Sequence, residues 1–356
     1  MSSGRDERRR SALAVVAPGT ALRDGLERIV RGNTGALIVL GFDPVVGQIC
    51  SGGFELAAAF SATRLRELAK MDGAIVLDEA CTRILRAAVQ LVPDPELPTQ
   101  ESGTRHRTAE RVALQTGFPV ITVSKSMRTV AVFTGGERYV LEESAALLTR
   151  AHQALVTLER YKRRLDGAAS ALTAAEIEDR ATVGDVAVVA QRLEMVGRIA
   201  DEISGYLVEL GTDGGLLGPQ ADELTSGIRC QRKQLLRDYC ASGPAGTHAL
   251  SADRLSKLSA DELLDLPAVA AAMGLADADG LEQRVSALGY RLLGQIPRVP
   301  QDAVDALIRQ FGGLQKLLSA SAEELRRVPG LDPPQAARVR EGLSRIAESA
   351  LLERYS

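Results

Sequence analysis

The hydrophobic pattern of this chain changes character near Tyr139, and no other feature constrains the fold as strongly. Before that point, short continuous apolar runs such as Ala36–Leu40 and Ala74–Leu77 alternate with segments of helical periodicity. A short apolar run bounded by turn residues is typical of a strand buried on both faces of a sheet. After that point, β-branched runs stop and helical periodicity continues over residues 142–288. The sequence therefore predicts an α/β domain with a mixed central sheet flanked by helices, followed by an all-helical part.

Within the first part, apolar side chains recur on one helical face over residues 20–31 and 62–70, which predicts two helices. Two further apolar runs, Val120–Val123 and residues 129–133, predict strands joined by a polar turn at residues 124–128.

The helical part contains a long seam of apolar residues at steps of three and four. Such a seam buries itself against a partner helix, so we expect a helical spine. The seam consists of Val186, Val189, Leu193, Val196, Ile199, Ile203, Leu207 and Leu210.

The chain of 356 residues is long enough for two or three domains at the usual size of roughly 100–200 residues each. Proline returns after residue 290, where it separates short helical segments. We therefore expect an α/β domain at residues 1–140, a helical spine at 141–289 and a third helical domain at 290–356.

Charge and cysteine usage exclude several classes of protein. Lys and Arg number 43 against 46 Asp and Glu, a formal net charge of −3, so no global field attracts nucleic acid and any contact with a polyanion must be local. The four cysteines include no CxxC pair, which argues against a zinc ribbon and a disulfide framework. No apolar stretch is long enough for a signal peptide or a membrane span, so we expect a cytoplasmic protein without membrane contact. The charged residues 1–10 predict a frayed N-terminal arm.

Familiar nucleotide-binding motifs are absent. No two glycines are separated by a single residue, so there is no GxGxxG, and there is no GxxxxGK[ST]. If the chain handles a nucleotide, it must do so with other groups.

One candidate group is Asp72, which stands before Gly73 at the entrance of a predicted strand. An Asp before Gly is often a turn-former or a cap. A carboxylate at a strand entrance can also hold a hard divalent cation, and Gly73 would allow a ligand to approach the backbone closely. The residues themselves leave both interpretations open.

A second candidate group is the run Gly103-Thr104-Arg105-His106-Arg107-Thr108, which reads as a loop entering a helix. The free amides and the positive dipole end of a first helical turn bind anions, and Thr104 and Thr108 add hydroxyl donors. Arg105 and Arg107 supply forked, permanently charged donors for phosphate oxygens, and His106 adds a polar ring. The alternative is a solvated basic turn whose charges pair with neighbouring acids such as Glu101 and Glu110.

Three stretches, residues 22–39, 68–75 and 98–111, together form a pattern whose most specific motifs are DGA at 72–74 and RHR at 105–107. This pattern closely resembles the diadenylate cyclase domain. With the helical middle and a C-terminal helix-hairpin-helix unit, the resemblance to this family extends over the whole chain.

The resemblance implies an enzyme that condenses two ATP molecules into cyclic di-AMP and pyrophosphate with Mg²⁺ or Mn²⁺, assembled as a homo-octamer whose cyclase domains face each other. It implies that Asp72 binds the metal and positions the attacking 3′-hydroxyl, with Arg105, His106 and Arg107 completing the catalytic set. It further implies nucleotide contacts from Gly73, Leu91, Thr104, Arg105, His106, Arg107, Thr108, Ser124 and Lys125. Lys125 stands where the family often has arginine, so the charge is kept and the fork is lost.

The C-terminal segment 325–339 resembles a helix-hairpin-helix, which grips a DNA phosphate without reading bases. The resemblance implies DNA, in branched form, as a partner. Asp332 replaces the usual second glycine of the hairpin and brings a negative charge near the expected phosphate, while Arg326, Arg327, Arg338 and Arg340 could compensate. A small helical packing module is the alternative for this unit.

For the whole chain, the alternative to an active cyclase is a DNA-structure-binding scaffold with an inactive nucleotide pocket. A product assay with ATP separates the two.

Overall fold

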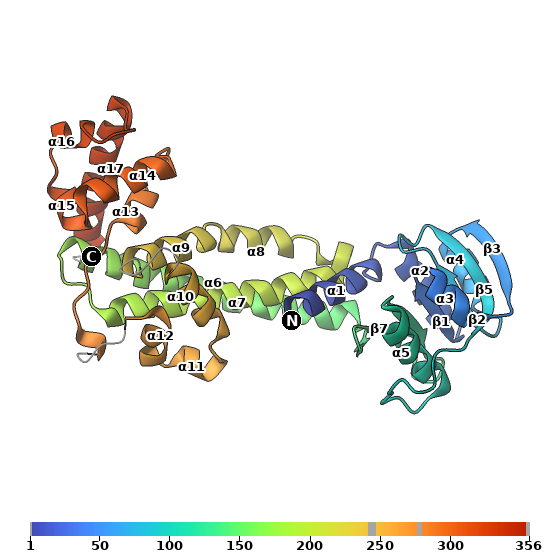
Figure 1. Cartoon of the computed structure of the whole chain (residues 1–356). Coiled ribbons are helices and arrows are strands. Elements are labelled where there is room, and N and C mark those ends of the chain that lie inside the picture. Colours follow the sequence, from blue (N-terminus) through green and yellow to red (C-terminus); the bar gives the residue numbers. More distant parts are fainter. Residues whose placement is uncertain (1, 241–246, 276–279, 354–356) are drawn as a thin grey trace. The chain divides into compact units, whose positions relative to one another are not determined.

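The computed structural model describes residues 2–240, 247–275 and 280–353 (Figure 1). The chain divides into two compact units: unit 1 comprises residues 1–153 and 203–218, and unit 2 comprises residues 154–202 and 219–356. The two long helices α6 (Ser144–Ile177) and α7 (Val183–Leu210) contribute to both units. The division into three domains stays a prediction.

Unit 1 contains a mixed sheet with the strand order β2-β5-β4-β1-β6-β7-β8. Its centre is β1 (Ala36–Leu40), which runs parallel to β4 (Ala74–Leu77) and antiparallel to β6 (Val120–Val123). The α/β class and the mixed sheet are thus confirmed. The other strands are β2 (Cys50–Ser51), β3 (Phe54–Ala59), which pairs with β5, β5 (Arg83–Leu91), β7 (Val130–Thr134) and β8 (Glu137–Val140).

Helices cover the two faces of the central strands. Because strand side chains alternate, Ile38, Ile75 and Ile121 share a buried cluster with α1 (Ser2–Val15), α2 (Ala21–Arg31) and α4 (Ala62–Leu68). Leu37, Val39 and Val76 pack instead with α3 (Pro44–Ile49) and α5 (Thr104–Thr116). The predicted helices and strands of this part occur, with their ends shifted by at most two residues.

The expectation of a frayed N-terminal arm was wrong. Helix α1 covers Ser2–Val15, and Ala12 within it and Val16 directly after it are 2% and 1% exposed in the core of unit 1. Their burial fixes the C-terminal end of the helix that includes the charged segment.

Residues 203–218 return to unit 1 after a long excursion. The Thr212 amide donates to the Pro18 carbonyl at 3.1 Å. Gly19 and Gly211 have φ of +91° and +48°, and a Cβ on Gly211 would lie 2.3 Å from the Pro18 oxygen, so this close approach requires glycine. Within this segment, a 3-10 helix at Gly211–Gly214 directly follows α7.

Unit 2 is entirely helical apart from one bridge between Thr182 and Arg284, as far as its described residues show. The predicted seam on α7 is buried at Val186, Val189, Leu193 and Val196. The remaining elements are α8 (Leu217–Thr225), α9 (Ile228–Tyr239), α10 (Thr247–Lys257), α11 (Ala260–Leu264), α12 (Leu266–Met273), a 3-10 turn at Gly280–Glu282, α13 (Tyr290–Gly294), α14 (Gln301–Phe311), α15 (Leu314–Ser319), α16 (Ala322–Arg326) and α17 (Pro333–Glu353).

A buried polar network joins α13 to helices α6 and α9. Both Asp238 oxygens accept hydrogen bonds from the amides that begin α13: Gly289 at 2.7 Å, Tyr290 at 2.6 Å and Arg291 at 2.8 Å. Burial raises the pKa of Asp238 to about 7, and the charge of Glu176 acts in the same direction. Glu176 Oε1 in turn accepts from Arg291 Nη1 at 2.6 Å and from the Tyr239 hydroxyl at 2.5 Å.

The C-terminal helices contain two hairpins of similar form. Arg298 and Gly330 occupy the left-handed region, with φ of +62° and +85°, two residues before Pro300 and Asp332, the N-terminal neighbours of α14 and α17. Asp332 turns back on its own helix, because its carboxylate accepts the Gln335 amide at 2.7 Å. Within the described part of the chain, no helix is long and apolar enough to cross a membrane.

Candidate active site

The candidate site lies across the ends of neighbouring strands at the centre of the sheet. The register pairs Ala36 with Val123, and Ile38 with Ile75, so continuing it places Gly35 beside Ser124 on one side and beside Asp72 on the other. Ala74 pairs with Val89, which places Leu91 on the far side of Asp72. Adjacent strands lie about 4.8 Å apart, so the backbones at Ser124 and Asp72 are roughly 10 Å apart. Residues from four distant chain segments thus meet in one row across the strand ends, in the order Ser124, Gly35, Asp72 and Leu91; we call this the edge row.

Helix α5 begins beside these strand ends with a positively charged first turn. Its N-cap is Gly103, which has no side chain to cap the helix, and the first helical hydrogen bond runs from the Arg107 amide to the Gly103 carbonyl at 2.9 Å. The preceding amides of the first turn are therefore available to a ligand. Thr104, Arg105 and Arg107 are exposed, and Thr108 donates its hydroxyl back to the Thr104 carbonyl at 3.0 Å.

A cavity of about 650 Å³ opens beside this first turn. Predicted residues Thr104, Arg105, His106, Ser124 and Lys125 line it together with Gly103, Asn33 and Ser126. Asp72, Gly73, Leu91, Arg107 and Thr108 do not line the cavity itself.

Asn33 and Ser126 did not stand out in the sequence. Asn33 adopts a φ of +51° in the turn before β1, a conformation that Asn tolerates. In the sequence, the Gly32-Asn33 pair therefore indicated a turn but did not indicate a binding role. The Ser126 hydroxyl lies 3.4 Å from that of Ser124, and the Met127 amide donates to Ser124 Oγ at 3.3 Å. The turn after β6 therefore presents paired hydroxyls beside Lys125.

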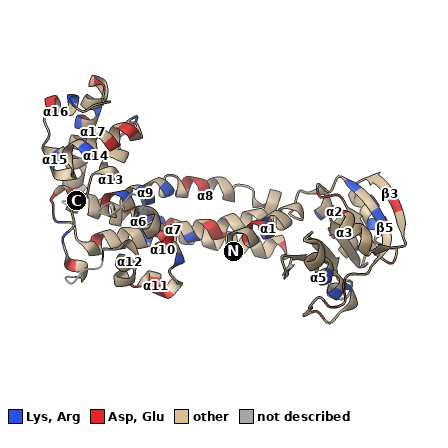
Figure 2. Ribbon diagram, in the orientation of Figure 1, with Lys and Arg blue, Asp and Glu red and all other residues tan. Residues whose placement is uncertain are grey.

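The acids near α5 are engaged elsewhere. Glu101 pairs with Arg138 of β8 at 3.0 Å, and Glu110 accepts the Thr99 hydroxyl and, at 3.1 Å, the Gln100 amide. Among the residues that the structure describes, no carboxylate pairs with Arg105 or Arg107. The basic turn does not pair with its neighbouring acids, so its positive charge remains for a ligand; Figure 2 shows basic positions on α5.

His106 is partly buried, unlike its exposed neighbours Arg105 and Arg107. Its ring lies 6.2 Å from the Phe133 ring, tilted by 58°, and Nδ1 faces Gly103. Burial of the ring and the positive charge of Arg138 lower the pKa of His106 below its usual value, with Arg105 acting in the same direction and Glu101 opposing them. The ring is therefore neutral near pH 7 and can offer one donor and one acceptor.

The backbone conformation and the packing at position 73 both require glycine. Its φ is +109°, and a Cβ there would lie 2.6 Å from the Ala88 carbonyl carbon. Ala88 itself has a φ of +54° at a point where the pairing of β4 and β5 shifts by one residue. Gly73 thus packs closely against the backbone of β5. Its neighbour Asp72 is exposed.

Leu91 ends β5 and is 8% exposed, in the same cluster as Leu37 and Val39. Leu91 is therefore part of the hydrophobic core at the edge row, next to the position of Asp72.

The donor set fits a metal that a nucleotide helps to bind. In the described residues, no group of three or more His, Cys, Asp or Glu side chains is arranged to hold a metal ion. Mg²⁺ needs no such cage, since it is commonly held by one or two carboxylates together with substrate phosphates and water. The strand register places the exposed carboxylate of Asp72 beside Gly35, so it is the acid that could contribute to such a site.

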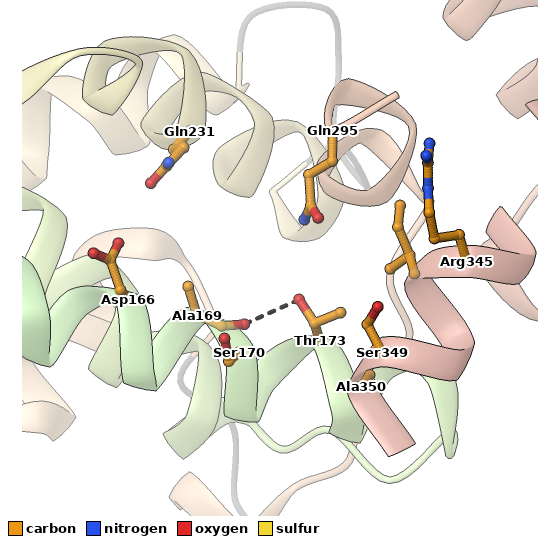
Figure 3. A pocket seen from close by; sticks show the side chains of 10 residues that line it. Asp166, Ala169, Ser170, Thr173, Gln231, Gln295, Arg345, Ser349 and Ala350 are labelled. Carbon is orange, nitrogen blue, oxygen red and sulfur yellow. Dashed lines mark hydrogen bonds between the residues drawn. The ribbon is translucent and has the colours of Figure 1, made fainter. Parts of the chain in front are cut away.

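Unit 2 contains a second cavity, of about 390 Å³, among α6, α9, α13 and α17 (Figure 3). Its lining is polar and includes Asp166, Gln231, Gln295 and Arg345, and the Thr173 hydroxyl donates to the Ala169 carbonyl at 3.0 Å. Two arginines of the neighbouring helix α9 have structural partners: Arg232 pairs with Glu194, and Arg237 pairs with Asp305 and stacks on Tyr290.

Comparison with known proteins gives consistent matches along most of the chain. Residues 23–138 match the family model described as DisA bacterial checkpoint controller nucleotide-binding, and residues 141–281 match the model described as DisA bacterial checkpoint controller linker region. The DNA integrity scanning protein DisA of Acidothermus cellulolyticus is 58% identical over 356 residues, covering 99% of this chain and 96% of that protein. The proteins of the same name from Frankia casuarinae and Streptomyces coelicolor are 60% and 56% identical, covering 97% and 99% of this chain and 97% and 96% of their own lengths.

Proposed function

The chain belongs to the DisA family and is a diadenylate cyclase, and on that premise we propose that it condenses two ATP molecules into one cyclic di-AMP and two pyrophosphates at the edge row of unit 1. One ATP binds each site with its triphosphate on the first turn of α5 and its metal ion on Asp72.

The observation that carries this proposal is the uncompensated positive charge at the start of α5. Arg105, Arg107 and Lys125 face a cavity or solvent, while the acids that could neutralise the turn are paired with other groups. A triphosphate carries about four negative charges, which matches such a cluster together with a divalent cation.

The roles follow from the positions. The open amides of α5 and the Thr104 hydroxyl would bind phosphate oxygens, and Arg105 would stabilise the charge that develops on the α-phosphate. Ser124 and Lys125 would bind the same nucleotide from the β6 turn. Asp72 would hold a divalent cation, Mg²⁺ or Mn²⁺, which would supply Lewis-acid chemistry to the phosphates, and the Asp72 carboxylate would orient the attacking 3′-hydroxyl.

Condensation of two nucleotides imposes a requirement on assembly. The 3′-hydroxyl of one ATP must reach the α-phosphate of the other in line, so two sites must face each other across an interface between copies of this chain. The proposal therefore includes a homo-oligomer, an octamer in the form that the family resemblance implies, and predicts that a lone unit 1 is inactive.

The test is a chromatographic product assay with ATP and Mg²⁺ or Mn²⁺. We expect cyclic di-AMP from the unaltered chain and none from Asp72→Asn or from the double variant Arg105→Ala/Arg107→Ala. Arg31→Ala, which removes an exposed arginine of α2, is the matched control and should retain activity. Circular dichroism should show all variants folded. Activity in the folded Asp72→Asn protein would remove the metal assignment.

The second candidate is a scaffold that binds DNA structures and keeps an inactive nucleotide pocket. The name of the relatives and the two hairpins with φ > 0 at Arg298 and Gly330 favour DNA as a partner of the C-terminal helices. ATP bound without any product over a long incubation would favour this candidate over the cyclase.

Regulation of the cyclase by DNA is part of the proposal. Branched DNA bound at the C-terminal hairpins would lower turnover through the helical spine, which joins the two functions covalently. Equal turnover with and without Holliday-junction DNA, under conditions where binding is demonstrated, would refute this coupling.

A further inference from the structure

Gly35 lies at the centre of the edge row, directly before β1. The strand register places it between Ser124 of the β6 turn and Asp72 before β4, about one strand spacing from each. Leu37, two residues on, packs on the α5 face of the sheet, so a side chain at position 35 would point toward α5 as well.

The space that such a side chain would fill is occupied by Arg105. A Cβ built on Gly35 lies 2.2 Å from Arg105 Nη1 and 3.1 Å from Cζ, and 3.2 Å from the Val123 carbonyl oxygen. The backbone conformation does not explain the glycine, since Gly35 is not among the glycines with positive φ. The close approach of the guanidinium does.

Arg105 thus extends from α5 over the start of β1, and it lines the cavity together with Ser124 and Lys125. No ion pair holds it there in the described part of the protein, and the bare backbone at position 35 leaves the space that its guanidinium occupies. A guanidinium in this place can bind phosphate oxygens held at the first turn of α5.

We infer that Gly35 is a positioning residue for the triphosphate, because the absence of a side chain there lets the Arg105 guanidinium lie over the start of β1 beside the cavity. The inference rests on the proposed function. A methyl group at position 35 would displace the guanidinium toward solvent. From there, the Arg105 side chain would lose conformational entropy when it binds a phosphate, which weakens binding.

The test measures binding of 3′-deoxy-ATP with Mg²⁺ by calorimetry on the full chain, because this nucleotide lacks the attacking hydroxyl and cannot be condensed. Gly35→Ala is expected to weaken binding about ten- to hundredfold, the range of one charge-assisted contact. Gly47→Ala, in α3 after the opposite end of β1, is the matched control, since its Cβ meets nothing closer than 3.6 Å. It should bind as the unaltered chain does.

A double-mutant cycle isolates the route through Arg105. Arg105→Ala should weaken binding by a similar factor, and Gly35→Ala/Arg105→Ala should bind no more weakly than Arg105→Ala alone. If the two losses multiply, Gly35 acts through another group, such as the Val123 carbonyl, and the inference is overturned.

The outcomes separate this inference from the proposed function. If Arg105→Ala weakens binding and Gly35→Ala does not, only the positioning role of Gly35 fails. If Arg105→Ala binds normally, the phosphate assignment of the preceding section fails with it. Should Gly35→Ala prove too unstable to assay, removal of the clash in Gly35→Ala/Arg105→Ala must raise its melting temperature, and the absence of that rise overturns the inference.

Discussion

The pair of Glu176 and Arg291 offers a quantitative test of what fixes α13 in unit 2. The side chain of Glu176 is fully buried and that of Arg291 is 8% exposed, and Oε2 of Glu176 has no partner in the described structure. Replacing Arg291 by Leu would leave a buried carboxylate with the Tyr239 hydroxyl as its one remaining side-chain donor. Removing one partner of a buried pair typically costs about 3–5 kcal/mol.

The assay is denaturant unfolding of the full chain at pH 7, followed by circular dichroism. Glu176→Gln/Arg291→Leu is the control, since it removes the buried charge together with its partner and should recover part of the lost stability. An Arg291→Leu deficit below about 1 kcal/mol, or one that the control does not reduce, would refute the reasoning.

Three further predictions address the site, the hairpin and the N-terminus. Arg138→Gln should raise the pKa of His106, because the Arg138 charge lowers it; ring resonances followed by NMR against pH test this, and an unchanged titration would contradict it. Asp332→Ser keeps a helix cap and removes a negative charge, so affinity for DNA should rise several-fold at low salt and less at high salt in a binding assay; equal or weaker binding would count against it. Leu13→Ala should destabilise unit 1 by about 2–5 kcal/mol in thermal or denaturant unfolding, since Leu13 is 5% exposed, whereas a loss below about 0.5 kcal/mol would indicate a frayed arm.

Strands with continuous apolar runs were predictable from the sequence because burial on both faces leaves a simple pattern. Strand β1 and strand β4 occur with the predicted bounds. Strand β5 was missed, although it is the longest, because the shift in its pairing near Ala88 interrupts the alternation of buried and exposed residues. Strand β3 was missed because nearly all of its residues are exposed, so burial imposes no alternation on it.

The site was predictable where its chemistry is local in sequence. The first turn of α5 carries its hydroxyl, guanidinium and imidazole groups in consecutive residues, and Asp72 precedes a recognisable strand. Arg138 and Gly35 could not be found in this way. Their relation to the turn depends on strand register and on a close approach between groups far apart in sequence, neither of which leaves a signal in a single chain.

The return of residues 203–218 to unit 1 has a consequence for the order of events during synthesis. On the ribosome, the nucleotide-binding part emerges early, but the segment whose Thr212 amide bonds to Pro18 follows only after a stretch that belongs to unit 2. At translation rates of about 5–20 residues per second, the wait is on the order of several seconds, during which the nascent part lacks a piece of its own packing. A polypeptide released at residue 153 would keep that gap permanently, and partial products of this kind are the ones we expect proteases to remove.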